Sequence, residues 1–84
     1  MGHLYVLYSE KLDKYFIGTT YGEIEDNLKR HNTGGNHLTA NGIPWEIHWY
    51  EELSYGPDRV SMHDLRQMSR SKLLRFLKKR KGRG

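Results

Sequence analysis

The sequence predicts a small α/β domain of the α+β type, in which a three-stranded, mainly antiparallel sheet is flanked by helices in the order β-β-α-β-α(-α). Two observations predict this class. Short runs of β-branched and aromatic residues fill the first half of the chain, and a helical apolar stripe set among basic residues fills its end. A chain of 84 residues that is 36% hydrophobic can build one modest core but not two. We therefore expect a single domain over residues 1–84.

Two strands are expected at the start of the chain. Leu4–Tyr8 is rich in β-branched and aromatic residues, which is typical of a buried strand, and Tyr15–Thr20 has the same character. The polar residues between them favour a turn around Lys11–Asp13. The two strands should therefore form a hairpin.

The first helix is expected over about Gly22–His31. Thr20 followed three residues later by Glu23 matches a capping box, which marks a helix start. Acidic residues come early in this segment and basic residues late, as the helix dipole prefers. The glycines that follow Thr33 should end the helix by Asn32.

The third strand is expected from Trp45, where large apolar residues alternate with polar ones. The alternation predicts that Trp45, Ile47 and Trp49 share one face of the strand, opposite Glu46, His48 and Tyr50.

The remainder is expected to be helical, with Asp58 as a candidate cap and Ser69–Ser71 as a candidate break between two helices.

The charge of the chain is divided sharply along the sequence. Residues 1–64 carry five Lys or Arg against ten Asp or Glu, a net charge of −5, whereas residues 65–84 carry nine Lys or Arg and no acid, a net charge of +9. This defines a basic C-terminal helix and tail from about 65 to 84. Such a segment can gather phosphate groups, although a solvated helix end has the same composition.

Composition narrows the chemistry further. The chain has no cysteine, which removes disulfides, thiolate catalysis and cysteine-based zinc sites. It has no long apolar run and no recognisable targeting segment, so we expect a cytoplasmic protein with no membrane partner. The histidines show no spacing typical of a metal site.

Four segments in order then resemble one known family, the GIY-YIG nuclease superfamily, and in particular its small standalone bacterial members. Tyr5, within Leu4–Glu10, takes the place of the tyrosine of the GIY strand. The YIG strand, the end of the first helix and the third strand of that family are matched by Phe16–Gly18, Leu28–Gly34 and Ile43–Glu52. The resemblance covers about Leu4 to Leu77 and implies the fold described above.

The resemblance also implies a chemistry, the hydrolysis of a DNA phosphodiester with one divalent metal ion. In that family a glutamate holds the metal, an arginine on the first helix stabilises charge on the phosphate, and two tyrosines and a histidine orient or activate the water. Tyr5 and His31 retain their groups. Phe16, Asn27 and Met62 stand where the second tyrosine, the arginine and the metal-binding glutamate are expected.

Loss of these three groups argues against catalysis. A thioether does not hold a hard cation of the magnesium type, and asparagine has no charge to stabilise the phosphate. A shift of two residues would bring Asp64 to the metal position, and Arg30 could replace the lost arginine. We expect Tyr5, Phe16, Asn27 and His31 to line one concavity, with Met62 or Asp64 at its edge.

Three functions follow as alternatives. The first is a catalytically degenerate module that needs no cofactor and binds nucleic acid, in the first instance DNA. The second is an active endonuclease that uses Tyr5, His31 and Asp64 with magnesium or manganese. The third is a protein-interaction domain on a nuclease-derived fold. In the first, the phosphate contacts would come from the basic residues of the C-terminal segment, Arg66, Arg70, Arg75, Lys78, Lys79, Arg80, Lys81 and Arg83.

Overall fold

The computed structural model of the protein describes residues 2–57 and 59–80. The predicted α+β class and the order β-β-α-β-α-α are confirmed. The elements are β1 (His3–Ser9), β2 (Lys14–Thr20), α1 (Ile24–Asn32), the short 3-10 helix η1 (Ala40–Gly42), β3 (Trp45–Glu52), α2 (Met62–Arg66) and α3 (Arg70–Lys79).

The three strands form one antiparallel sheet in the order β2-β1-β3. The predicted hairpin of β1 and β2 is confirmed, and its turn places Asp13 in the left-handed region with φ 53°. The central strand, β1, pairs along its length with both neighbours, so Tyr5 lies opposite Gly18 on one side and Tyr50 on the other. Four consecutive residues of β1, Leu4–Leu7, are buried, as expected for a central strand covered on both faces.

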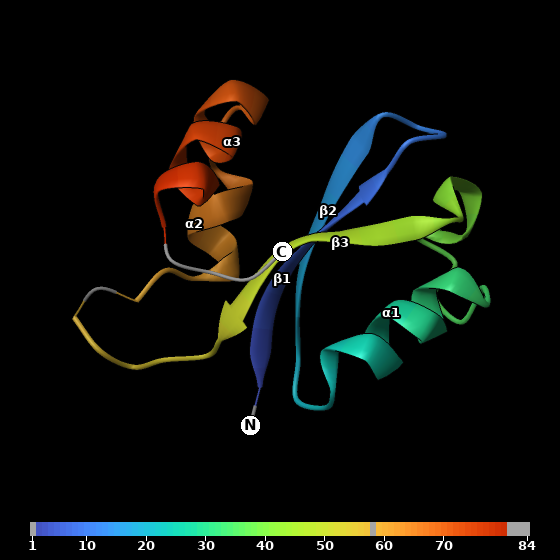
Figure 1. Ribbon diagram of the computed structural model, residues 1–84, viewed down its shortest axis with the longest axis horizontal. Helices are drawn as coiled ribbons and strands as arrows, with labels where there is room; N and C mark the ends of the chain where they lie inside the picture. Colours follow the sequence, from blue (N-terminus) through green and yellow to red (C-terminus); the bar gives the residue numbers. More distant parts are fainter. Residues whose placement is uncertain (1, 58, 81–84) are drawn as a thin grey trace.

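Helices cover the two faces of the sheet (Figure 1). Helix α1 lies against one face, whereas α2 and α3 lie against the other. Alternate residues of β1 supply the two cores, because successive side chains of a strand point to opposite faces. Leu4 and Val6 pack with Leu65, Leu73 and Leu77 beneath α2 and α3. Tyr5 and Leu7 pack on the α1 side together with Ile24 and Trp45.

A β-bulge in β3 overturns the expectation for the two tryptophans. Val6 pairs with Trp49 and Leu7 pairs with Ile47, so His48 is an extra residue at this point of the ladder. The bulge reverses the alternation. Trp49 therefore packs with the core beneath α2 and α3, and Trp45 packs with Ile47 on the α1 side.

The start of α1 also differs from the prediction. The residue that caps α1 is Glu23, and its side chain makes no capping hydrogen bond. Thr20 is still the last residue of β2, and its hydroxyl accepts from the Gly22 N–H at 3.3 Å. The capping-box interpretation of Thr20 is therefore wrong, because strand pairing extends through that residue. The helix begins at Ile24, two residues after the predicted start, and ends at Asn32, as the glycines after Thr33 predict.

Two serines begin the C-terminal helices. Ser61 and Asp64 form a reciprocal capping box at α2, with both hydrogen bonds at 3.1 Å. Ser69 caps α3 by accepting from the Lys72 N–H, which confirms the predicted break between two helices. The candidate cap Asp58 lies outside the described residues.

Among residues 2–57 and 59–80, no helix has the length and apolar character that crossing a membrane requires.

Candidate functional site

The four residues expected to lie together do so, on the α1 side of the sheet. The Tyr5 hydroxyl of β1 lies 3.1 Å from Nε2 of His31 in α1. The Phe16 ring of β2 contacts both, with ring centroids 6.5 Å from Tyr5 and 5.3 Å from His31. Asn27 lies one turn before His31 on the same helix, and its side-chain amide lowers the pKa of the Tyr5 phenol.

A hydrogen-bond chain fixes the protonation state of His31. Thr39 donates its hydroxyl proton to the Asn36 carbonyl at 3.1 Å, because a carbonyl can only accept. The Thr39 oxygen therefore accepts from Nδ1–H of His31 at 2.8 Å. This leaves Nε2 without a proton, so it accepts from the Tyr5 hydroxyl. His31 is thus assigned as the neutral Nδ1–H tautomer.

The electrostatics of the pair agree with this assignment. Burial lowers the pKa of His31, and the charge of Arg30 lowers it further. Burial raises the pKa of the Tyr5 phenol, and the Asn27 amide and the charges of Arg30 and Arg66 offset part of this rise. At neutral pH both groups are therefore uncharged, with the phenol as donor.

These residues close into a buried cluster, so the expectation of an open concavity is wrong. Tyr5 and His31 are each 3% exposed and Asn27 is 6% exposed. The cluster is sealed because Phe16 packs edge-on against both His31 and Trp45. Oδ1 of Asn27 is buried without a hydrogen-bond partner among the described residues.

Gly18 provides the space for Tyr5. A Cβ atom at residue 18 would lie 2.6 Å from the Tyr5 hydroxyl and 2.8 Å from Cζ of the same ring. The Tyr5 ring therefore lies directly against the backbone of β2 at this glycine.

Thr39 and Asn32 are two structural residues that sequence reasoning missed. The Thr39 carbonyl accepts from Nε1 of Trp45 at 2.7 Å, while its hydroxyl holds His31. The Asn32 side chain bonds both the N–H and the carbonyl of Trp45, at 2.6 and 2.9 Å. Together they attach the end of α1 to the start of β3. The sequence could not predict this role, because Thr39 and Asn32 lie among other polar residues and nothing in their spacing distinguishes them.

Residues at the proposed metal position do not fit a magnesium ion. Met62 is half-buried and packs against the core beneath α2 and α3, on the opposite side of the sheet from Asn27. The expectation that Met62 lies at the edge of the Tyr5 cluster is therefore wrong, and so is the alignment that placed Met62 at the metal position. Asp64 is exposed, and its carboxylate accepts from the Ser61 N–H, which lowers its pKa. A thioether in an apolar core and a carboxylate already used as a helix cap offer no octahedral oxygen set. No metal-dependent step follows from these residues.

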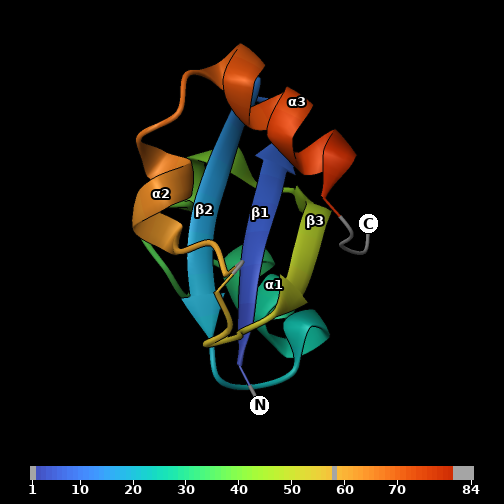
Figure 2. The same cartoon turned by 90° about the vertical axis from the view of Figure 1, so that its left-hand side faces the viewer.

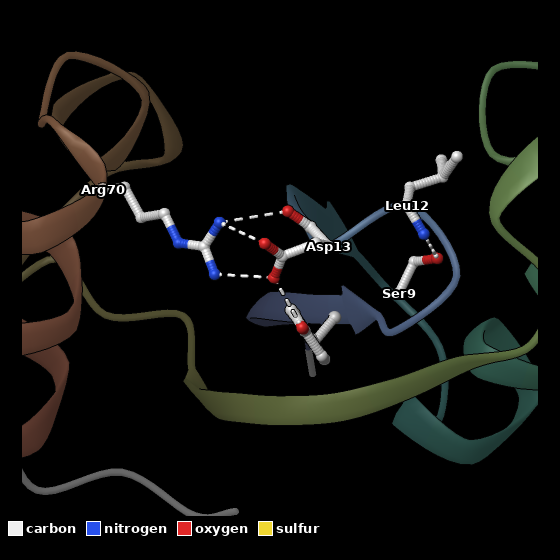
Figure 3. Close-up of polar contacts among 5 residues, drawn as sticks. Ser9, Leu12, Asp13 and Arg70 are labelled. Carbon is white, nitrogen blue, oxygen red and sulfur yellow. Dashed lines mark hydrogen bonds and ion pairs between the residues drawn. The ribbon is translucent and has the colours of Figure 1, made fainter.

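Three of the candidate phosphate-binding arginines instead bond to the domain. Arg66 donates to the Ile17 carbonyl of β2 at 2.9 Å. Arg70 forms a two-pronged ion pair with Asp13 in the hairpin turn, with the shortest distance 2.8 Å (Figure 3). Arg80 pairs with Glu51 of β3 at 2.6 Å. These side chains attach α2 and α3 to the sheet.

The remaining cations of α3 point to solvent. Arg75, Lys78 and Lys79 are exposed, as is Lys72, which sequence analysis did not include. The sequence could have predicted this, because Lys72 is three residues before Arg75 and therefore lies near it on the same side of a helix. Lys81 and Arg83 lie outside the described residues.

Comparison with known proteins gave no match to a family model, to a curated protein or to a solved structure.

Proposed function

We propose that this chain is a nucleic-acid-binding module on a GIY-YIG-like fold that has lost nuclease catalysis. The observation that carries the proposal is the solvent-facing side of α3. Lys72, Arg75, Lys78 and Lys79 are all exposed there, and the helix contains no acidic residue.

Helix geometry supports a single cationic surface. At about 100° per residue, these four side chains lie on the side of α3 opposite the buried Leu73 and Leu77. From Lys72 to Lys79 the helix rises about 10 Å, which is enough to contact several phosphates of one strand. Among the described residues, none of the four is in an ion pair. Their charges are therefore available to a polyanion.

Loss of catalysis is supported by the buried cluster. A water-activating pair must reach water, whereas Tyr5 and His31 bond to each other and are each 3% exposed. Asn27 and Phe16 supply neither a charge nor a second phenol.

Fluorescence anisotropy tests the binding. Single-stranded and duplex DNA and RNA of mixed sequence, end-labelled, are titrated at several salt concentrations. We expect affinity to fall steeply with salt, because phosphate contacts release counterions. The double variant Arg75→Glu, Lys79→Glu should bind at least roughly tenfold more weakly and with a shallower salt slope.

The control is Lys11→Glu, Lys29→Glu, which makes the same charge change at exposed positions in the hairpin turn and in α1, outside α3. Equal losses in the two double variants would show attraction by net charge alone and would contradict a binding surface on α3. Absence of binding by the unmodified chain at low salt would remove the proposal.

A cleavage assay tests the second part of the proposal. With magnesium or manganese, we expect no cleavage of single-stranded, duplex or branched DNA. Robust cleavage that is abolished by Asp64→Ala would instead establish the active endonuclease.

A further inference from the structure

A pocket of about 460 Å³ opens at the outer edge of β2 and is distinct from the cationic side of α3. Its walls come from the strand on one side and from α2, α3 and the joint between them on the other. Its volume lies within the range of pockets that hold small molecules, about 300–1,000 Å³. The lining residues are Asp13–Ile17, Leu65, Arg66, Met68, Arg70 and Leu73.

The interior of this pocket is apolar. Ile17 and Met68 are half-buried, and they pack against a core that includes Leu65 and Leu73. A ligand body that replaced water here would gain from removing this apolar surface from solvent. The pocket therefore favours an aromatic or branched aliphatic group.

The side chains of Arg66 and Arg70 both line the pocket, and they differ in the groups to which they donate hydrogen bonds. Arg70 is held by Asp13 through both of its terminal nitrogens and lies over the Tyr15 ring, with Cζ 5.2 Å from the ring centroid. Its charge is compensated by the Asp13 carboxylate. Arg66 is exposed and donates to one neutral group, the Ile17 carbonyl, at 2.9 Å. No carboxylate of the described residues pairs with Arg66.

We propose that this pocket binds a small amphipathic carboxylate, with its apolar body against Ile17, Met68 and Leu73 and its carboxylate on Arg66. The guanidinium of Arg66 carries five N–H donors in a planar fork that matches a carboxylate, and only one of them is used in the bond to Ile17. Arg70 and Asp13 form a neutral wall at the other end.

The position of α2 favours a small ligand over an extended peptide. Helix α2 lies beside the outer edge of β2, where a peptide would have to add as a strand (Figure 2). Arg66 also occupies the carbonyl of Ile17, which a pairing strand would need as an acceptor. A compact ligand can enter between these groups without displacing them.

The test is an NMR titration of the 15N-labelled chain with 4-phenylbutyrate and, in parallel, with 4-phenylbutanamide. The two probes share the same apolar body, and only the first is an anion. We expect both to shift the amide signals of Ile17, Met68 and Leu73. The carboxylate should bind roughly three- to tenfold more tightly, as a charged hydrogen bond implies.

The matched variants are Arg66→Met and Arg75→Met, which remove one guanidinium at the pocket and one on the solvent-facing side of α3. Arg66→Met should abolish the preference for the carboxylate while binding of the amide persists. Arg75→Met should leave both affinities unchanged. Persistent amide binding also shows that the Arg66→Met variant is folded.

Three results would overturn the proposal. The first is equal affinity of the unmodified chain for the two probes. The second is signal shifts confined to the solvent-facing side of α3. The third is an equal loss of carboxylate affinity in both methionine variants.

Discussion

Tyr5 and Gly18 face each other across β1 and β2, and the tyrosine ring lies on the glycine so closely that a methyl group there would be 2.6 Å from the phenol oxygen. This contact sets the direction of the hydroxyl. With the ring held against β2, the hydroxyl meets Nε2 of His31, which comes from the helix on the same side of the sheet. The glycine therefore positions the buried pair although it has no polar side chain of its own.

Replacing Gly18 with alanine should destabilise the fold by about 1–3 kcal/mol, as overpacking of a tight core does. Urea unfolding followed by tryptophan fluorescence measures the change. Gly22→Ala is the matched control, because a Cβ at residue 22 meets nothing within 4 Å. Similar effects of the two substitutions would show that the Tyr5 ring can move aside.

Removing the Tyr5 hydroxyl should leave a buried acceptor without its donor. Tyr5→Phe deprives Nε2 of His31 of its hydrogen bond, and a buried unsatisfied polar atom costs about 1–3 kcal/mol. Equilibrium unfolding measures the loss. Tyr21→Phe is the control, since Tyr21 is 82% exposed. A stability equal to that of the unmodified chain would contradict the hydrogen bond.

The stability of the domain should fall as the solution is acidified below about pH 6.5, the pKa of histidine in an unfolded chain. Burial lowers the pKa of His31 in the folded state. Between the two pKa values the unfolded chain binds the proton more readily, so the contribution of neutral His31 is present above about pH 6.5 and is lost as pH falls toward the folded pKa.

Unfolding free energies measured from pH 7.5 to 5 test this dependence. His31→Gln should flatten the slope, whereas the exposed His37→Gln should not. Long-range 1H–15N spectra should also show the proton of His31 on Nδ1. A proton on Nε2 would reverse the assigned direction of the hydrogen-bond chain.

The Asp13–Arg70 ion pair should show its own pH dependence at lower values. Hydrogen bonds from Arg70, and secondarily from the Tyr8 hydroxyl, hold the pKa of the Asp13 carboxyl at about 2. The stabilisation is present above the unfolded value of about 3.9 and is lost as pH falls through about 2. Asp13→Asn keeps a residue that tolerates the positive φ and removes the charge.

We expect Asp13→Asn to be less stable than the unmodified chain at pH 5, with the difference closing as pH approaches 2. Amide hydrogen exchange in α3 should also speed up, because Arg70 is the first residue of that helix. Asp26→Asn, at an exposed position in α1, provides the control. A difference that is constant with pH would show that the ion pair contributes nothing.

The sequence predicted those parts of the fold that depend on local patterns. The hairpin strands follow from apolar runs, the position of α1 from the order of its acidic and basic residues and the glycines after it, and the break before α3 from its serines. All of these signals come from neighbouring residues. The bulge at His48 could not be predicted in this way. It depends on how β3 pairs with Val6 and Leu7, and a single extra residue moves Trp49 to the other face.

The start of α1 also depends on a contact that is distant in the sequence. Thr20 and Glu23 have the spacing of a capping box, but strand pairing with His3 holds Thr20 in β2. At Ser61 no strand competes for the residue, and the box with Asp64 forms. The spacing of a capping box is therefore not sufficient by itself, because pairing with a distant strand can hold the first residue in an extended conformation.

For the candidate site, the resemblance to the GIY-YIG superfamily predicted which residues lie together. It did not predict that they are buried. Tyr5, Phe16, Asn27 and His31 do meet. Closure of the cluster depends on the Phe16 ring packing between His31 and Trp45, a contact among three separate elements. Likewise, charge counting could not tell that Arg70 and Arg80 are paired with Asp13 and Glu51.

The three-layer arrangement gives the molecule an electrical polarity. The exposed acids at the start of α1, Glu23, Glu25 and Asp26, lie on one side of the sheet, and the exposed cations of α3 lie on the other. A polyanion that approached the start of α1 would meet three carboxylates, whereas one that approached the solvent-facing side of α3 would meet cations alone. The domain would therefore be turned toward such a partner before any contact forms, and at low ionic strength this orientation would raise the rate of productive encounters.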